Sequence, residues 1–140
     1  MSVLGQIVTN AIKFPRRLAV RDDRQTYTYA KLVGGAMFLA EKIEAVSTAA
    51  HVGIMLPTSG SFSLALLAIW LAKRVAVPLN YLLAPDELRY VIEDSDIDTI
   101  ITAEVMLEVF GGSTIPHRIG LLRIENVDFT GPPPLRWPPM

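Results

Sequence analysis

The sequence contains no cysteine, which excludes disulfide bonds, thiolate metal sites and a cysteine nucleophile. It also lacks an excess of either charge, because 13 Lys and Arg residues face 14 Asp and Glu residues and the net charge is −1. A nearly neutral chain offers no electrostatic footprint for nucleic acid, so we expect no nucleic-acid partner. The absence of cysteine fits a reducing compartment, and we expect a cytoplasmic protein.

Long apolar runs are missing as well. The longest, residues 62–72, is about half of the ~20 residues that a membrane-spanning helix needs, so we expect a buried core helix and no transmembrane segment. No basic residue precedes the first apolar residues, since Lys13, Arg16 and Arg17 come later, and this argues against a secretory signal. Apolar residues are abundant, at 51% of 140, which is enough for one domain with a real core.

Alternating apolar patterns predict an α/β protein with a mostly parallel sheet and flanking helices. The expected helices cover residues 3–12, 29–46, 62–72, 85–93 and 103–110, the last with a Gly111-Gly112 C-cap. The expected strands cover residues 18–21, 26–28, 51–56, 75–77, 99–102 and 119–124, with a polar turn at residues 22–25.

The second helix is expected to begin after Thr28, whose hydroxyl can accept a hydrogen bond from a free N–H of the first turn. A 4-3-4-3 spacing predicts one buried face, made of Leu32, Ala36, Leu39, Ile43 and Val46. Gly34 and Gly35 each weaken a helix by ~1 kcal/mol relative to alanine, and close packing against a neighbour is the simplest reason for keeping them.

Residues 51–80 predict one βαβ unit, with a first strand that is apolar on both faces, as in a parallel sheet. Ser59 or Ser61 can cap the helix of this unit. Ligands bind at the carboxyl ends of parallel strands, so residues 57–61 and 78–82 form a candidate ligand edge.

Residues 58–61, Thr-Ser-Gly-Ser, combine small hydroxyl residues with glycine in front of a helix, as phosphate-binding loops do. No Gly-Lys-Ser/Thr sequence follows, and Phe62 opens an apolar helix. We therefore interpret the segment as a turn and helix cap, with contact to a ligand as the alternative.

Asp94, Asp96 and Asp98 alternate like the start of a calcium loop. The pattern also needs Gly and Glu at places where Thr99 and Val105 stand, so we interpret the three carboxylates as a solvated helix end and turn.

The other candidate groups have structural explanations. His51 and His117 are far apart and lack metal-ligand spacing, and no serine has a Gly-x-Ser-x-Gly setting. The adjacent Asp86 and Glu87 follow Pro85 at the positive end of a helix, which suits negative charge. We assign no catalytic, cofactor-binding or metal-ligating residue to this chain.

Five segments in a fixed order carry a resemblance: residues 14–20 (Phe-Pro-Arg-Arg-Leu-Ala-Val), 26–32 (Thr-Tyr-Thr-Tyr-Ala-Lys-Leu), 52–62, 71–80 and 85–95. Together they resemble the N-terminal part of the adenylate-forming enzymes, which include acyl-CoA synthetases, luciferases and nonribosomal peptide adenylation domains. The Pro-Leu-Asn sequence at residues 78–80 favours acyl-CoA or acyl-carrier-protein synthetases.

The resemblance implies a full enzyme that activates a carboxylic acid, such as a fatty acid, with ATP and transfers the acyl group to a thiol. ATP, Mg²⁺ and CoA (or an acyl carrier protein) are the implied cofactors and acceptors. The family's phosphate loop contains Thr-Gly-x-Pro-Lys, which residues 58–61 lack, and its catalytic Lys would lie beyond residue 140. We therefore expect an N-terminal fragment that binds no cofactor and is inactive alone, with residues 1–125 as an α/β subdomain and residues 126–140 as a Pro-rich tail.

The sequence departs from the family pattern at two places. Lys31 stands where the family often has Glu, so the usual capping box is incomplete. Arg74 stands where glycine is usual, which costs ~1–2 kcal/mol if that residue is left-handed.

The expected partner is the remainder of the synthetase. A fragment of a larger sheet would also expose an edge, so the alternatives are a homodimer or a non-catalytic module that docks on a partner. A free-standing small enzyme with an unrecognised site is a third alternative.

Overall fold

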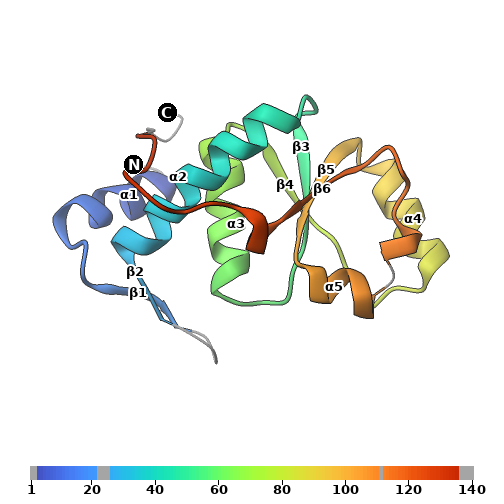
Figure 1. The fold of residues 1–140 in the computed structure, drawn as a ribbon, viewed down its shortest axis with the longest axis horizontal. Helices are drawn as coiled ribbons and strands as arrows, with labels where there is room; N and C mark the ends of the chain where they lie inside the picture. Colours follow the sequence, from blue (N-terminus) through green and yellow to red (C-terminus); the bar gives the residue numbers. More distant parts are fainter. Residues whose placement is uncertain (1–2, 22–25, 111, 136–140) are drawn as a thin grey trace.

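The structure is a computed structural model that describes residues 3–21, 26–110 and 112–135 (Figure 1). The helices are α1 (Val3–Lys13), α2 (Tyr29–Val46), α3 (Gly60–Leu71), α4 (Pro85–Asp94) and α5 (Glu104–Val109), and the 3-10 helices are η1 (Gly112–Thr114) and η2 (Ile124–Asn126). The strands are β1 (Leu18–Arg21), β2 (Thr26–Thr28), β3 (His51–Met55), β4 (Val75–Pro78), β5 (Ile97–Thr102) and β6 (Gly120–Arg123).

The main sheet is parallel throughout, with strand order β4-β3-β5-β6. Helices α2 and α3 cover one face and α4 and α5 cover the other (Figure 1). The pleat of β3 serves both layers, because Ile54 joins the apolar cluster under α2 and α3 while Met55 joins the cluster under α4 and α5. The predicted α/β fold with a mostly parallel sheet and flanking helices is confirmed.

A separate antiparallel ribbon of β1 and β2 leads into α2. The turn predicted at residues 22–25 lies outside the described residues. The Thr28 hydroxyl accepts a hydrogen bond from the N–H of Lys31 at 3.2 Å, so the predicted cap of α2 is confirmed.

The predicted apolar face of α2 is buried except at its last member. Leu32, Ala36, Leu39 and Ile43 are at most 3% exposed. Val46 is 54% exposed, so its predicted burial was wrong: the apolar cluster between α2 and α3 includes Ile43 but does not reach the last residue of the helix.

The two glycines of α2 have different surroundings. A Cβ atom on Gly35 would lie 2.7 Å from Cδ1 of Leu64, so the predicted close packing is confirmed there. A Cβ atom on Gly34 would meet only Cγ of Pro133 at 3.8 Å, which is an ordinary contact. Close packing therefore does not explain the glycine at position 34.

The turn between α3 and β4 is left-handed at Lys73, with φ 62°, and not at Arg74. The conformational cost expected for Arg74 therefore falls on the preceding lysine. Arg74 instead donates a hydrogen bond from Nη2 to the carbonyl oxygen of Ser47 at 3.0 Å, which connects the turn to the C-terminal end of α2.

Most predicted boundaries agree with the structure within two residues. Strand β5 begins at Ile97, two residues before the predicted start. Phe110 occupies the C-cap position of α5 and Gly112 begins η1. The glycine that would follow the C-cap, Gly111, lies outside the described residues, so the predicted Gly111-Gly112 cap stays a prediction.

After β6 the chain runs back over α2 towards α1 (Figure 1). The described part of this segment, residues 127–135, contains no helix or strand, as its prolines predict. Phe129 packs edge-on against Phe38 of α2, with ring centroids 6.2 Å apart. Within the described ranges, no helix has the length and apolar character needed to cross a bilayer.

Candidate functional site

The carboxyl edge of the sheet is the first candidate site. Strands β3 and β4 are parallel neighbours, so the loops that follow them, which include residues 57–61 and 78–82, emerge at the same edge. The chain leaves β3 towards β4 on one side and leaves β5 towards β6 on the other. The point where the direction of the connections reverses therefore lies between β3 and β5, where open α/β sheets bind ligands.

The β3–β5 crevice is tied together by a buried side chain. The Thr102 hydroxyl donates a hydrogen bond to the carbonyl oxygen of Met55 at 2.9 Å, which joins the last residues of the two strands. The sequence analysis did not predict this switch point, the place where the direction of the connections reverses. Locating it requires the order of the strands, which short-range sequence patterns do not contain.

Residues 58–61 form the turn and helix cap that the sequence predicts. The hydroxyl of Ser59, not that of Ser61, accepts a hydrogen bond from the N–H of Phe62 at 3.4 Å. Gly60 is required by packing, because a Cβ atom there would lie 1.9 Å from Cε2 of Tyr27. The buried Tyr27 ring thus covers the first turn of α3.

Three charged side chains gather at the carboxyl ends of β5 and β6. Nε of Arg123 lies 2.5 Å from Oε2 of Glu104, and Oε1 of Glu125 accepts a hydrogen bond from the N–H of Glu104 at 2.8 Å. Glu125 thereby caps α5, whose own N-cap residue makes no side-chain hydrogen bond. Glu104 is 19 positions from Arg123 and 21 positions from Glu125, and no local sequence signal joins it to them.

The interpretation of Asp98 as part of a solvated turn was wrong. Asp98 lies within β5, and its carboxylate accepts hydrogen bonds from the N–H groups of Thr48 and Ala49 at 2.9 and 3.1 Å. The hydroxyls of Ser47, Thr48 and Thr99 donate to it as well.

Burial raises the pKa of Asp98, but the hydrogen bonds from Thr48, Ala49 and Thr99 outweigh it and lower the pKa from 3.8 to about 2. The carboxylate fastens the loop between α2 and β3 to the start of β5. Over the described residues, no three metal-ligating side chains form a group that could hold an ion.

The remaining candidates lie where the sequence placed them. His51 is the first residue of β3 and is half-buried, while His117 is exposed in a turn. Asp86 and Glu87 are exposed in the first turn of α4, behind Pro85.

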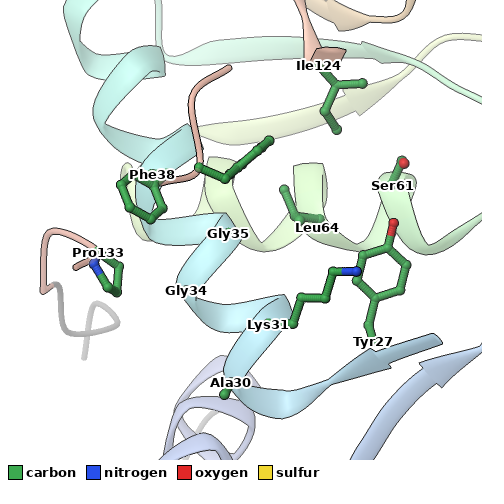
Figure 2. Close-up of a pocket in the computed structure, with 11 residues that line it drawn as sticks. Tyr27, Ala30, Lys31, Gly34, Gly35, Phe38, Ser61, Leu64, Ile124 and Pro133 are labelled. Atoms are coloured by element: carbon green, nitrogen blue, oxygen red, sulfur yellow. The ribbon is translucent and has the colours of Figure 1, made fainter. Parts of the chain in front are cut away.

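A groove between α2 and α3 is the second candidate site (Figure 2). Its volume is about 480 Å³. Helix α2 contributes Lys31, the two glycines and Phe38, and α3 contributes Ser61 and Leu64. The segment after β6 closes the far side with Ile124, Phe129 and Pro133.

A mostly parallel sheet with flanking helices, which the structure shows, is the fold expected from the five segments. The family model described as AMP-binding enzyme matches residues 7–129, and the chain belongs to this family. The resemblance predicted from the sequence is confirmed.

Two curated relatives illustrate the range of the family. The chain is 25% identical to the mitochondrial malonate–CoA ligase ACSF3 of Xenopus laevis over 128 residues, which cover 86% of this chain and 22% of the relative. It is 34% identical to the glycine betaine reductase ATRR of Emericella nidulans over 90 residues, which cover 63% of this chain and 7% of the relative. The chain thus spans less than a quarter of either relative.

Solved structures show the same fold. The O-succinylbenzoate coenzyme A synthetase of Bacillus subtilis superimposes with a TM-score of 0.74 and 24% identity, over 86% of this chain and 25% of that one. The fatty acid AMP ligase of Legionella pneumophila gives a TM-score of 0.76 and 17% identity, over 91% of this chain and 24% of that one.

Proposed function

We propose that this chain is the N-terminal part of an AMP-forming acid–thiol ligase. The full enzyme activates a carboxylic acid, such as a fatty acid, with ATP and passes the acyl group to CoA or to an acyl carrier protein. The observation that carries the proposal is the family match over residues 7–129. This match includes all five of the ordered segments that carry the resemblance. The absence of cysteine supports a cytoplasmic location.

The chain's own part in this function is to support the sheet beside the nucleotide and acyl sites. Stabilising a transferring phosphate requires several cationic groups or Mg²⁺. At the carboxyl ends of β5 and β6, the Arg123 guanidinium is already paired with Glu104. Residues 58–61 also lack the Thr-Gly-x-Pro-Lys loop of the family, so we assign ATP, Mg²⁺ and CoA to the full enzyme and expect the 140 residues to be inactive alone.

The purified 140-residue chain is expected to give no carboxylate-dependent exchange of pyrophosphate into ATP. The assay uses a panel of malonate, acetate and octanoate, with a complete family member as the positive control. Exchange above a protein-free blank that disappears in an Arg123→Met variant would overturn the proposal.

A second candidate function is assembly without catalysis. Among the strands that the structure describes, β4 pairs only with β3 and forms an edge of the sheet, and its Val75 is 54% exposed. An unpaired edge of this kind can accept a strand from a second copy of the chain.

If assembly is the function, light scattering after size exclusion should give twice the mass of one chain. A Val75→Lys variant should then be monomeric, because a charge on the edge opposes pairing. A monomer at all concentrations of the unmodified chain contradicts this candidate.

A further inference from the structure

A second groove lies between α1 and α2. Its volume is about 410 Å³. Apolar side chains of the two helices line it: Val8, Ala11 and Ile12 from α1, and Ala30, Val33 and Met37 from α2. The described residues that line this groove carry no charge, so an apolar side chain fits it better than an ionised one.

The segment after η2 borders this groove, and we refer to its residues 128–135 as the strap. Phe129 anchors the strap at one end through its edge-on contact with Phe38 of α2. Further along, Pro133 passes over Gly34, where its Cγ would lie 3.8 Å from an added Cβ atom (Figure 2). Pro133 lines both the α2–α3 groove and the α1–α2 groove, so the strap crosses α2 between them.

The strap ends at an apolar side chain that its own copy leaves uncovered. Leu135 lines the α1–α2 groove but is 88% exposed. Prolines occupy positions 132–134, and their fixed φ angles make the end of the strap stiff and extended. Leu135 therefore stands at the rim of a groove that it does not fill.

We infer that this face is an interface between two copies of the chain, in which Leu135 of each copy occupies the α1–α2 groove of the other. The projecting leucine and the apolar groove are neighbours on one face, so a single two-fold rotation brings both pairs together. Such an interface is closed and gives a dimer and not a filament. Ile12, which is 63% exposed in the wall of the groove, becomes covered in the same step.

This interface is distinct from pairing at the edge of the sheet. It consists of α1, α2 and the strap, and no residue of β4 lines the groove. The inference does not depend on the proposed ligase function, because it involves no substrate, nucleotide or catalytic group.

The first test is light scattering after size exclusion of the full 140-residue chain, which should show a reversible monomer–dimer equilibrium. Leu135→Asp should weaken the dimer about a hundredfold, because it removes a buried leucine worth about tenfold at each of the two equivalent sites. Since Leu135 is 88% exposed in one copy, this variant should unfold at the same temperature as the unmodified chain when both are monomeric.

Two control variants separate this interface from other surfaces. Leu82→Asp changes another exposed leucine, at 75%, that lies outside the groove, and it should leave the dimer unchanged. Val75→Lys opposes pairing at the β4 edge and should also leave the dimer unchanged.

The second test uses the absence of cysteine from the chain, which lets single introduced cysteines report which surfaces meet. A mixture of Ala30→Cys and Leu135→Cys chains should form a disulfide between the two chains on mild oxidation. Cysteine is small and apolar, and the disulfide retains even a weakened dimer. Ala84→Cys, at the exposed N-cap position of α4, replaces Ala30→Cys in the control mixture and should give about tenfold less product.

Each contrary result overturns the inference. A monomer at all concentrations up to about 1 mM does so, as do equal effects of Leu135→Asp and Leu82→Asp. Loss of the dimer in Val75→Lys would assign association to the sheet edge. Equal disulfide yields from the Ala30→Cys and Ala84→Cys mixtures would remove the groove from the interface. A monomer in which Ala30→Cys resists alkylation would mean that the chain fills its own groove.

Discussion

Replacement of Gly60 by alanine is expected to lower the free energy of unfolding by about 3 kcal/mol. A Cβ atom at this position would lie 1.9, 2.5 and 2.7 Å from three carbon atoms of the Tyr27 ring. The ring is 3% exposed and belongs to the cluster under α2 and α3, so displacing it disturbs the packing of that cluster. Urea denaturation followed by circular dichroism measures the loss.

Gly34 and Gly35 provide matched controls within α2. Gly34→Ala should stabilise the protein by about 0.5–1 kcal/mol, because alanine favours a helix and the new methyl meets only an ordinary contact. The effect of Gly35→Ala on the free energy of unfolding should lie between those of Gly60→Ala and Gly34→Ala. The new methyl would lie 2.7 Å from Cδ1 of Leu64, but that side chain can rotate away. Equal effects of the Gly60 and Gly34 replacements would show that the Tyr27 contact does not explain Gly60.

A double variant isolates the cause. Tyr27→Leu removes the ring that the new methyl would strike, so adding Gly60→Ala to that background should cost much less than it does alone. The coupling energy between the ring and position 60 is the cost of Gly60→Ala in the unmodified chain minus its cost in the Tyr27→Leu background. A coupling energy of zero would mean that the Tyr27 ring does not cause the cost.

Replacement of Asp98 by asparagine is expected to lower the free energy of unfolding at pH 7 by about 1–2 kcal/mol. A fall in pKa from 3.8 to about 2 corresponds to ~2.5 kcal/mol, and we reduce this figure because the half-buried carboxylate remains partly screened by solvent. Neutral asparagine also loses the charge that strengthens the hydrogen bonds from Thr48 and Ala49.

The pH dependence follows from the direction of the shift. The pKa of Asp98 is lower in the folded state, so its stabilisation is present above about pH 4 and is lost as the pH falls towards 2. The stability difference between the unmodified chain and Asp98→Asn should therefore shrink across this interval. Asp94→Asn, at the exposed end of α4, should change stability by less than ~0.5 kcal/mol. A difference that persists unchanged at pH 2 would contradict this role.

The sequence predicted those parts of the fold that depend on neighbours along the chain. Apolar periodicity located the helices and strands, and the hydroxyls of Thr28 and Ser59 cap helices as their positions predict. The family pattern marked position 74 as left-handed only if its usual glycine serves such a turn, and the structure has the positive φ at Lys73 instead.

The parts that could not be predicted depend on contacts between distant residues. Asp98 receives hydrogen bonds from a loop about 50 positions earlier, and Glu104 meets a guanidinium from the next strand. Strand order, the switch point and the α2–α3 groove are likewise products of tertiary packing, which a pattern of nearest neighbours does not encode. Val46 was misplaced for the same reason, since periodicity gives the face of a helix but not the extent of its cover.

The strand order β4-β3-β5-β6 has a consequence for synthesis on the ribosome. Strand β4 can pair with β3 as soon as both have emerged, but the opposite side of β3 stays open until β5 follows. At typical rates of translation this interval lasts roughly one to five seconds. During it, the backbone groups on the open side of β3 are accessible to other nascent chains or to chaperones, so slow codons between residues 78 and 102 should favour aggregation.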